Sequence, residues 1–327
     1  MSVNIDLILA NLAPSLRGLI FSLPENILET LEEIRLRKLR PLALSYRGKI
    51  AFVTARGEIT SNSQEAYVVS PEELELTVQI ISKSSLYAFA EELKNGFLTL
   101  PGGHRVGVGG RFTLVDGKIA GVKEIGSLNF RLAREVTGCT VSLLPQLVDP
   151  GGKPYSTLVV SPPQCGKTTF LRDLAYQFST GAPSLGLAGS KVVIVDERSE
   201  IAGVYEGIPQ MNVGSSTDVL DACPKAEGIL IAVRALSPDV IITDEIGTSR
   251  DVEALQEAVN SGVRVMASVH AGSWRELEER PSLKPLFAES TFQRAVLLSH
   301  RRGPGTVEGI LRLDRPEPEA GEVAEGA

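Results

Sequence analysis

The chain of 327 residues contains only three cysteines, and no two of them form a CxxC pair. Cys139, Cys165 and Cys223 are odd in number and far apart in the sequence, so neither a disulfide framework nor a structural zinc site is indicated. This cysteine content fits a reducing compartment.

Long hydrophobic runs are also missing. No apolar stretch reaches the roughly 18 to 20 residues that are needed to span a bilayer. The first residues lack the basic start, the apolar core and the small-residue cleavage site of an export signal. We therefore expect a cytosolic protein, or one that docks on a membrane through something else.

A basic excess is missing as well. Lysine and arginine number 33 against 40 aspartates and glutamates, which gives a net charge of −7, and aromatic residues make up only 5% of the chain. Binding of a nucleic-acid backbone needs cations, and binding of a single strand needs aromatic platforms for the bases. We therefore expect no nucleic-acid partner, and we rank translocation along a single strand last among the candidate functions.

The first half of the chain contains short mixed segments. Ile27, Leu31 and Ile34 recur at helical spacing with charged residues between them, which predicts an amphipathic helix over residues 27–39. Pro41 is expected to end this helix.

Further elements follow in this half. Residues 42–46 and 49–54 are predicted to form strands around a turn. Ser70 and Glu73 have the spacing of a capping box, which predicts the start of a helix that continues to about residue 82.

A glycine-rich segment, residues 101–110, resembles a phosphate loop at first sight. A phosphate loop should begin a helix, but this segment leads into a strand at residues 111–115. Asp116 and Gly117 then supply the positive φ angles of a two-residue turn before a strand at residues 118–122. We therefore predict a hairpin in which the glycines allow strand bends and close packing.

From residue 157 onward, strands alternate with helices, which predicts a mostly parallel sheet covered by helices. The predicted fold class is α/β, with a mostly parallel sheet in the second domain, preceded by a smaller α+β N-terminal domain. We expect the first domain at residues 1–138, the domain with the parallel sheet at residues 139–314 and a disordered acidic tail at residues 315–327.

The strongest functional signal is a P-loop at residues 161–168. A phosphate-binding loop of this class needs a buried strand, converging backbone amides, a lysine and a hydroxyl at a helix N-terminus. We expect Lys167 to reach the β and γ phosphates of ATP and the Thr168 hydroxyl to complete a Mg²⁺ shell. The expected nucleotide-binding residues are Ser161, Pro162, Pro163, Gln164, Cys165, Gly166, Lys167, Thr168 and Thr169.

Ser161 departs from the usual pattern, because it stands where the standard motif has its first glycine. An apolar strand before the loop and an amphipathic helix after it nevertheless match what the mechanism requires. The alternative is an ordinary strand-to-helix turn with Thr168 near the cap. Cys165 lies inside the loop and is expected to be an inert small residue.

Two acidic pairs follow predicted strands. Asp244 and Glu245 end an apolar strand in the Walker B arrangement, in which the aspartate holds the metal and the glutamate orients or deprotonates the attacking water. Asp196 and Glu197 end another strand and compete for the same roles, Asp196 at the metal and Glu197 in catalysis. The alternative for this second pair is a solvated start of a loop, and the sequence leaves open which pair holds the metal.

His270 ends a third such strand. An imidazole at that edge could sense the γ-phosphate, and the alternative is a histidine that is only hydrogen-bonded at the end of a strand. His104 and His300 are predicted to be structural, and Trp274 is predicted to contribute packing.

These residues resemble the secretion-type ATPases of the RecA-like P-loop class. Residues 196–200 match the acidic box of that class, and residues 261–270 match its histidine box, except that Val263 replaces the first histidine. More closely, the chain resembles the stage III sporulation protein AA family from about residue 20 to residue 312. The segments that resemble this family are residues 33–37, 85–89, 101–107, 127–131 and 302–306.

The resemblance implies that residues 139–314 form a RecA-like P-loop ATPase domain, which is Mg²⁺-dependent and assembles as a ring, expected to be a hexamer. It also implies membrane-embedded sporulation channel proteins as partners and a place on the mother-cell side of that complex. Ring motors commonly complete the site with an arginine from the next subunit, and Arg131, Arg134 and Arg198 are the candidates. Two alternatives remain: an assembly module that binds ATP with little turnover, favoured by Ser161, and a P-loop kinase acting on a small molecule.

Overall fold

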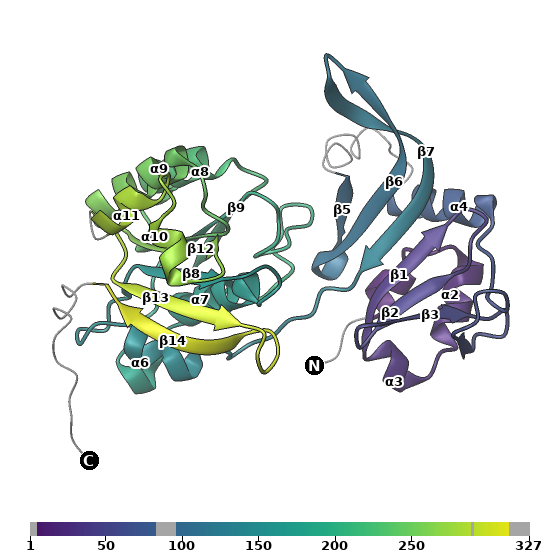
Figure 1. The fold of residues 1–327 in the computed structure, drawn as a ribbon, viewed down its shortest axis with the longest axis horizontal. Helices are drawn as coiled ribbons and strands as arrows, with labels where there is room; N and C mark the ends of the chain where they lie inside the picture. Colours follow the sequence, from purple (N-terminus) through teal and green to yellow (C-terminus); the bar gives the residue numbers. More distant parts are fainter. Residues whose placement is uncertain (1–4, 83–95, 289–290, 314–327) are drawn as a thin grey trace. The chain divides into compact units, whose positions relative to one another are not determined.

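The computed structural model describes residues 5–82, 96–288 and 291–313 (Figure 1). The chain divides into two compact units. The first consists of Met1–Glu135 together with Gly203–Gln210, and the second consists of Val136–Ala202 together with Met211–Ala327. Residues 85–89, one of the segments on which the family resemblance rests, and the predicted tail, residues 315–327, lie outside the described residues.

The first unit is built on an antiparallel sheet whose strands lie in the order β4-β3-β2-β1-β7-β6-β5. All of its neighbouring strands run in opposite directions. The strands are β1 (Leu31–Arg37), β2 (Ala43–Tyr46), β3 (Lys49–Val53), β4 (Ile59–Thr60), β5 (Phe97–Leu100), β6 (His104–Val115) and β7 (Lys118–Arg131).

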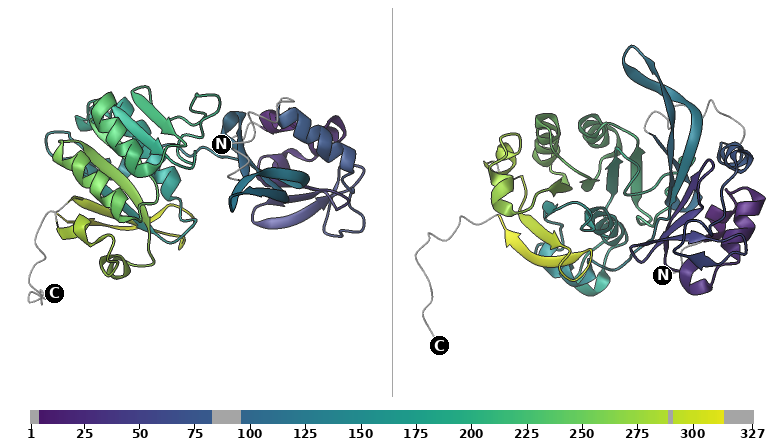
Figure 2. Two further views of the ribbon diagram at one scale, coloured as in Figure 1. Left: turned by 90° about the horizontal axis from the view of Figure 1, so that it is seen from above. Right: turned by 45° about the vertical axis from the view of Figure 1, so that its right-hand side comes forward.

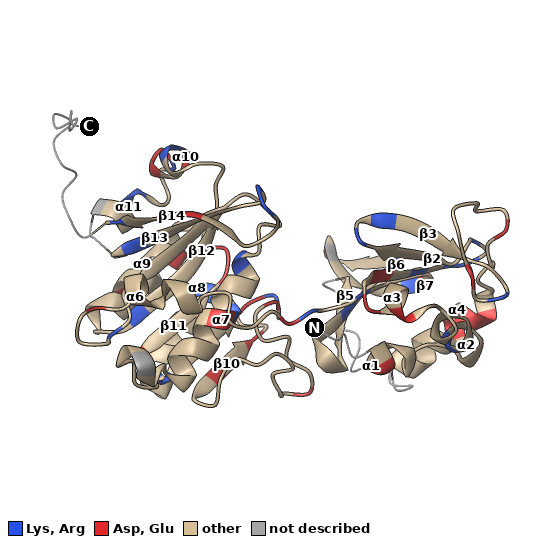
Figure 3. Ribbon diagram, turned by 90° about the horizontal axis from the view of Figure 1, so that it is seen from below, with Lys and Arg blue, Asp and Glu red and all other residues tan. Residues whose placement is uncertain are grey.

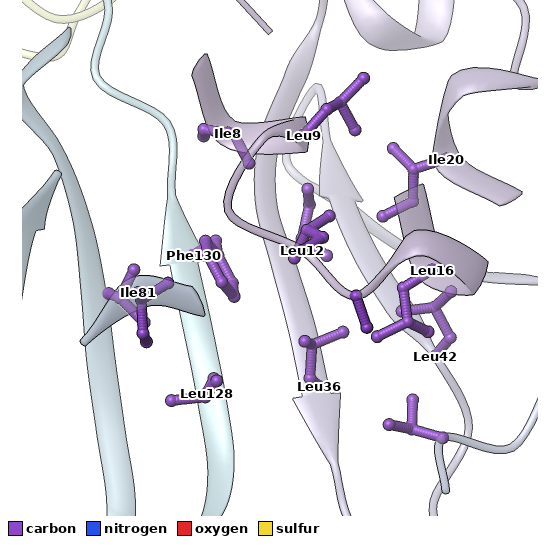
Figure 4. Packing of buried hydrophobic residues seen from close by; sticks show 14 of the residues in the cluster. Ile8, Leu9, Leu12, Leu16, Ile20, Leu36, Leu42, Ile81, Leu128 and Phe130 are labelled. Carbon is purple, nitrogen blue, oxygen red and sulfur yellow. The ribbon is translucent and has the colours of Figure 1, made fainter. Parts of the chain in front are cut away.

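Helices supply the other half of this unit's core. They are α1 (Ile5–Leu9), α2 (Pro14–Phe21), α3 (Glu25–Leu28) and α4 (Pro71–Ile81), and a 3₁₀ turn, η1 (Pro101–Gly103), joins β5 to β6. Ile8 and Leu16 of the helices join Leu36 of β1 and Phe130 of β7 in one buried cluster (Figure 4). The burial of these apolar side chains holds the helices on the sheet.

The helix predicted over residues 27–39 is wrong, because most of this segment forms the strand β1. The strand has a bulge: Leu31 pairs with Tyr46 and Glu33 with Ser45, so β1 carries one residue more than its partner. As a result Leu31 and Ile34, three positions apart, are both fully buried. The bulge therefore gives the buried residues of this strand the three-residue spacing that is typical of a helix.

Other predictions for this unit are confirmed. β2 and β3 surround the turn at Arg47, and Ser70 and Glu73 form both hydrogen bonds of the capping box at the start of α4. β6 and β7 form the predicted hairpin, with φ angles of 51° at Asp116 and 74° at Gly117. The glycine-rich segment belongs to this hairpin and does not begin an α-helix.

The second unit contains a sheet in the order β10-β9-β11-β12-β8-β13-β14, parallel except for β14. Its strands are β8 (Thr157–Ser161), β9 (Val192–Asp196), β10 (Thr217–Asp221), β11 (Val240–Thr243), β12 (Arg264–His270), β13 (Arg294–Ser299) and β14 (Thr306–Arg312). The predicted alternation of strands and helices from residue 157 onward is confirmed.

Helices cover both faces of this sheet (Figure 2). They are α6 (Leu144–Leu147), α7 (Lys167–Thr180), α8 (Lys225–Ile231), α9 (Ser249–Asn260), α10 (Trp274–Glu278) and α11 (Lys284–Ala288). Short turns η2 (Val141–Leu143) and η3 (Pro183–Leu185) and a π-helical turn η4 (Ala232–Leu236) complete the unit. Leu158 of β8, Ile229 of α8 and Leu255 of α9 lie in one buried cluster.

The strand order brings four chain segments to one edge of the sheet. β9, β11, β12 and β8 are consecutive and parallel, so their carboxyl ends lie side by side. His270, at the end of β12, is in register with Ser161, at the end of β8. In doubly wound sheets, ligands bind at this edge.

No helix in the described ranges is long and apolar enough to cross a membrane. Basic and acidic positions are interspersed along the ribbons of both units (Figure 3).

Candidate active site

The loop between β8 and α7 forms a tight turn before the helix. Gln164 has a φ angle of 61° and Gly166 has one of 86°, and Lys167 is the first residue of the helix. A side chain at position 166 would place its Cβ 3.1 Å from the backbone nitrogen of Gly305, which itself donates to the Cys165 carbonyl at 2.9 Å. Glycine is therefore required at position 166 for its backbone angle and for this close approach.

Lys167 lies with its ammonium group folded back along the loop. Nζ donates to the Ser161 carbonyl at 3.2 Å, to the Ser161 hydroxyl at 3.2 Å and to the Pro162 carbonyl at 3.0 Å. It is also 2.7 Å from Nδ1 of His270. Burial lowers the pKa of Lys167, although the nearby Asp244 and Glu245 carboxylates oppose the shift.

Thr168 and Asp244 form the part of the site that fits a divalent metal. The Thr168 hydroxyl donates to Oδ2 of Asp244 at 2.9 Å, and the Ser268 hydroxyl donates to the other oxygen of Asp244. A hydroxyl beside a carboxylate is a donor set that Mg²⁺ accepts, because this ion uses one or two carboxylates and completes its shell with phosphates and water. Among the described residues, no group of three or more His, Cys, Asp or Glu is placed to hold a metal ion by itself.

Glu245 is held on both sides. Its Oε1 is 2.6 Å from Nε2 of His270, and its Oε2 accepts from Arg198 at 2.6 Å. Because the Lys167 ammonium donates to Nδ1, the imidazole proton resides on Nε2 and points at Glu245. Burial raises the pKa of Glu245, but the His270 hydrogen bond and the Arg198 charge outweigh it and lower the pKa overall. The carboxylate is therefore ionised at neutral pH.

Asp196 has a different environment from Asp244. Its two oxygens accept hydrogen bonds from the amides of Glu200, Ile201 and Ala202 at 2.7 to 2.9 Å. Burial raises its pKa to about 6, opposed by these amides. Since the carboxylate already organises a turn of backbone, this arrangement favours Asp244 over Asp196 as the metal ligand.

We expect Asp196→Ala to lower the free energy of unfolding of the second unit by about 3 kcal/mol, because it leaves three backbone amides without acceptors. Denaturant unfolding measures the change. Asp218→Ala, at an exposed aspartate of β10, is the matched control and should stay within about 0.5 kcal/mol of the wild type. Equal losses in the two variants would contradict the structural role of Asp196.

Glu197 lies beside this turn and faces a lysine that the sequence did not single out. Its Oε2 is 3.4 Å from Nζ of Lys225, and the same ammonium donates to the Glu245 carbonyl at 2.9 Å. A small cavity is lined by Glu197, Lys225, Asp244 and Glu245, among others. The two acidic pairs thus border one space, although they play different parts around it.

The other predicted residues of the loop line its path. Ser161 and Cys165 are buried, while Pro162, Pro163 and Gln164 are exposed. The Cys165 thiol lies 3.6 Å from the Pro163 carbonyl. The hydroxyl of Ser161, the residue that replaces the first glycine, serves as an acceptor for Lys167.

The two histidines predicted to be structural form hydrogen bonds with the backbone, and the tryptophan packs against another aromatic ring. His104 accepts from the backbone amide of Ala133 at 3.0 Å. His300 is 3.2 Å from the Pro163 carbonyl, so it lies closer to the P-loop than the sequence indicated. Trp274 packs edge-on against Phe287, with ring centroids 5.2 Å apart.

The three candidate arginines have distinct contacts. Arg198 binds Glu245, as described, with 62% of its side chain exposed. Arg131 lies 3.8 Å from Glu33, and Arg134 donates to the Leu31 carbonyl at 3.0 Å. Of these three arginines, Arg198 is the one that contacts a predicted catalytic residue, Glu245.

Three residues at this site were not predicted from the sequence: Arg172, Lys225 and Ser268. Arg172, on α7, donates to the carbonyls of Glu200 and Ile201 and so shares with Asp196 the support of their turn. Ser268 has a signal in the sequence, because it interrupts an apolar strand two positions before His270 and so shares its face. A cation at the first position of a helix, opposed by the helix dipole, is a weaker signal for Lys225.

The sporulation stage III, protein AA family model matches residues 4–315. The chain belongs to this family. A curated relative, stage III sporulation protein AA of Bacillus subtilis (strain 168), is 43% identical over 303 residues, which cover 93% of this chain and 94% of that protein. The predicted resemblance to the family is thereby confirmed.

Solved structures show the fold. The ATPase DotB of Legionella pneumophila is similar with a TM-score of 0.53 at 15% identity, over 82% of this chain and 72% of that one. The pilus retraction motor PilT with bound ADP is similar with a TM-score of 0.50 at 15% identity, over 84% of this chain and 76% of that one. The predicted α/β fold, with a mostly parallel RecA-like sheet, is confirmed.

Proposed function

We propose that this protein hydrolyses ATP in a Mg²⁺-dependent reaction and that it works as a ring-forming motor of the secretion-ATPase type. The observation that carries the proposal is the arrangement at the edge of the second sheet. There the Thr168 hydroxyl lies 2.9 Å from Asp244, and the Lys167 ammonium is joined through His270 to Glu245. A phosphate-binding lysine, a metal-binding pair and an ionised carboxylate are the parts that phosphoryl transfer to water requires.

Each residue has a role in this reaction. The loop amides and Lys167 bind the phosphates of ATP, and Thr168 and Asp244 hold Mg²⁺, which neutralises phosphate charge when bound. Glu245 orients the attacking water and accepts its proton. When Lys167 moves towards a phosphate, Nδ1 of His270 loses its donor while Nε2 keeps its hydrogen bond to Glu245, so His270 senses the arrival of the phosphate.

The cellular role proposed here follows the family. We propose that a ring, expected to be a hexamer, acts on the mother-cell side of a membrane complex and energises membrane-embedded sporulation channel proteins. The name of the Bacillus subtilis relative supports the link to sporulation. An arginine from a neighbouring subunit would complete each site, and Arg131 and Arg134 remain candidates for that role.

A second candidate function is an assembly module that binds ATP with little turnover. The observation that favours it is the set of hydrogen bonds donated by the Lys167 ammonium. The Ser161 hydroxyl adds an acceptor that a glycine could not supply. ATP has to displace the ammonium from these contacts before the loop can bind phosphate. This requirement slows entry into the catalytic state without preventing binding.

Steady-state phosphate release, measured with Mg²⁺ and with EDTA over a range of protein concentrations, tests the proposal. We expect release only with Mg²⁺, at a rate per protomer that rises as rings form; mass measurement with a non-hydrolysable ATP analogue follows the assembly. Binding of ATP without phosphate release at any concentration would favour the assembly module. Transfer of labelled phosphate to an acceptor other than water would favour a kinase.

A further inference from the structure

Lys225 occupies an unfavourable position for a cation. It is the first residue of α8, where the helix dipole opposes positive charge, and α8 continues directly into the π-helical turn η4. Its side chain is only 8% exposed. Lysine is rarely buried unless it is paired, so the contacts of its ammonium group must account for its place.

Those contacts join the ends of two neighbouring strands. Nζ donates to the Glu245 carbonyl, beyond the end of β11, at 2.9 Å and to Oε2 of Glu197, beyond the end of β9, at 3.4 Å. β9 and β11 are adjacent and parallel. Lys225 therefore links Glu197 and Glu245, two of the glutamates that border the small cavity.

The backbone of Glu245 explains why such a link is useful. Its φ angle is 49°, in the left-handed region, which is strained for a residue other than glycine. The surroundings fix this conformation at both sides of the residue: the Ser268 hydroxyl accepts from the amide at 3.0 Å, and Lys225 donates to the carbonyl. The same backbone conformation determines where the Glu245 carboxylate points.

We propose that Lys225 is a positioning residue for hydrolysis, which holds the main chain of Glu245 and the carboxylate of Glu197 so that both acids face one space. The inference rests on the proposed ATPase function and deepens it. In the described residues the hydrogen bonds of this ammonium go to Glu245 and Glu197, and none goes to the P-loop or to the Thr168 and Asp244 pair. Its loss should therefore change kcat and leave nucleotide binding almost unchanged.

Three substitutions separate the charge, the hydrogen bond and the apolar stem of Lys225. Lys225→Arg keeps the charge and the donors, Lys225→Gln keeps one donor without the charge, and Lys225→Met keeps only the stem. We expect kcat for ATP to fall at least tenfold in the methionine variant, less in the glutamine variant and least in the arginine variant. The Kd of Mg²⁺-ATP should stay within about threefold of the wild type in all three.

Lys191→Met is the matched control, because Lys191 is an exposed lysine of the same unit; its kcat should equal that of the wild type. Should the methionine variant fail to fold, the comparison of glutamine with arginine provides the same test. Rates within twofold of the wild type in every variant, or a parallel loss of kcat and affinity without rescue by arginine, would overturn the inference. A wild type that binds but does not hydrolyse ATP would overturn the proposed function itself, and the role of Lys225 with it.

Discussion

Replacing Glu245 by glutamine is expected to lower kcat for ATP hydrolysis by about 100-fold while leaving the Kd of Mg²⁺-ATP within about threefold of the wild type. Glutamine keeps the size of the side chain and an oxygen that can accept from Arg198, but it cannot accept a proton from water. The low pKa of Glu245 keeps the wild-type carboxylate ionised at neutral pH, so the substitution removes a functioning base. Steady-state phosphate release and equilibrium nucleotide binding measure the two quantities.

Glu253→Gln makes the same chemical change at an exposed glutamate of α9 and should leave both quantities unchanged. A Glu245→Gln variant that hydrolyses ATP as fast as this control would remove Glu245 from the mechanism. A large loss of nucleotide affinity would instead give Glu245 a role in binding.

Lys167→Ala should have the second large effect, a loss of about 100-fold in affinity for ATP. The ammonium is buried, and the phosphates have to replace its contacts with Ser161, Pro162 and His270 when they bind. Alanine removes the cation that makes this exchange favourable. Titration with a fluorescent ATP analogue measures the Kd in the presence of Mg²⁺.

The control for this change is Lys153→Ala, at an exposed lysine just before β8, which should bind ATP like the wild type. Unchanged affinity in Lys167→Ala would mean that the loop does not bind phosphate as proposed. Both lysines lie in the second unit, so a general effect of lost positive charge would show in both variants.

The parts of the site that lie close together in the sequence could be predicted from it. A P-loop is a strand, a turn and a helix in succession, so the placement of Lys167 at the first position of α7 follows from local pattern. The approach of Asp244 and His270 to this loop could also be predicted, because parallel strands connected by helices bring their carboxyl ends to one edge.

Contacts between distant segments could not be predicted in this way. Lys225 reaches Glu245 across twenty positions of the chain, and Arg172 reaches Ile201 across twenty-nine. No local spacing marks either pair. The two acidic pairs also look alike in the sequence. The structure distinguishes them, because backbone amides surround Asp196 and two hydroxyls contact Asp244.

The strand β1 shows a different limit. Its buried positions, Leu31 and Ile34, are separated by a bulge that depends on pairing with β2, a strand later in the chain. A pattern analysed without its partner strand cannot reveal an extra residue on one side of the pair. The predicted helix agrees with the periodicity of the apolar residues, but the pairing of β1 with β2 makes the segment a strand.

The register between His270 and Ser161 has a consequence for how the protein would respond to nucleotide. Adjacent strands are separated by about 4.8 Å, and they cannot move apart without breaking the hydrogen bonds between them. Binding of a phosphate at the P-loop is then expected to leave the strands in place and to rotate one long side chain, that of Lys167. The His270 imidazole then loses this neighbour, and we expect the change to reach Glu245 and, through Glu245, the exposed guanidinium of Arg198.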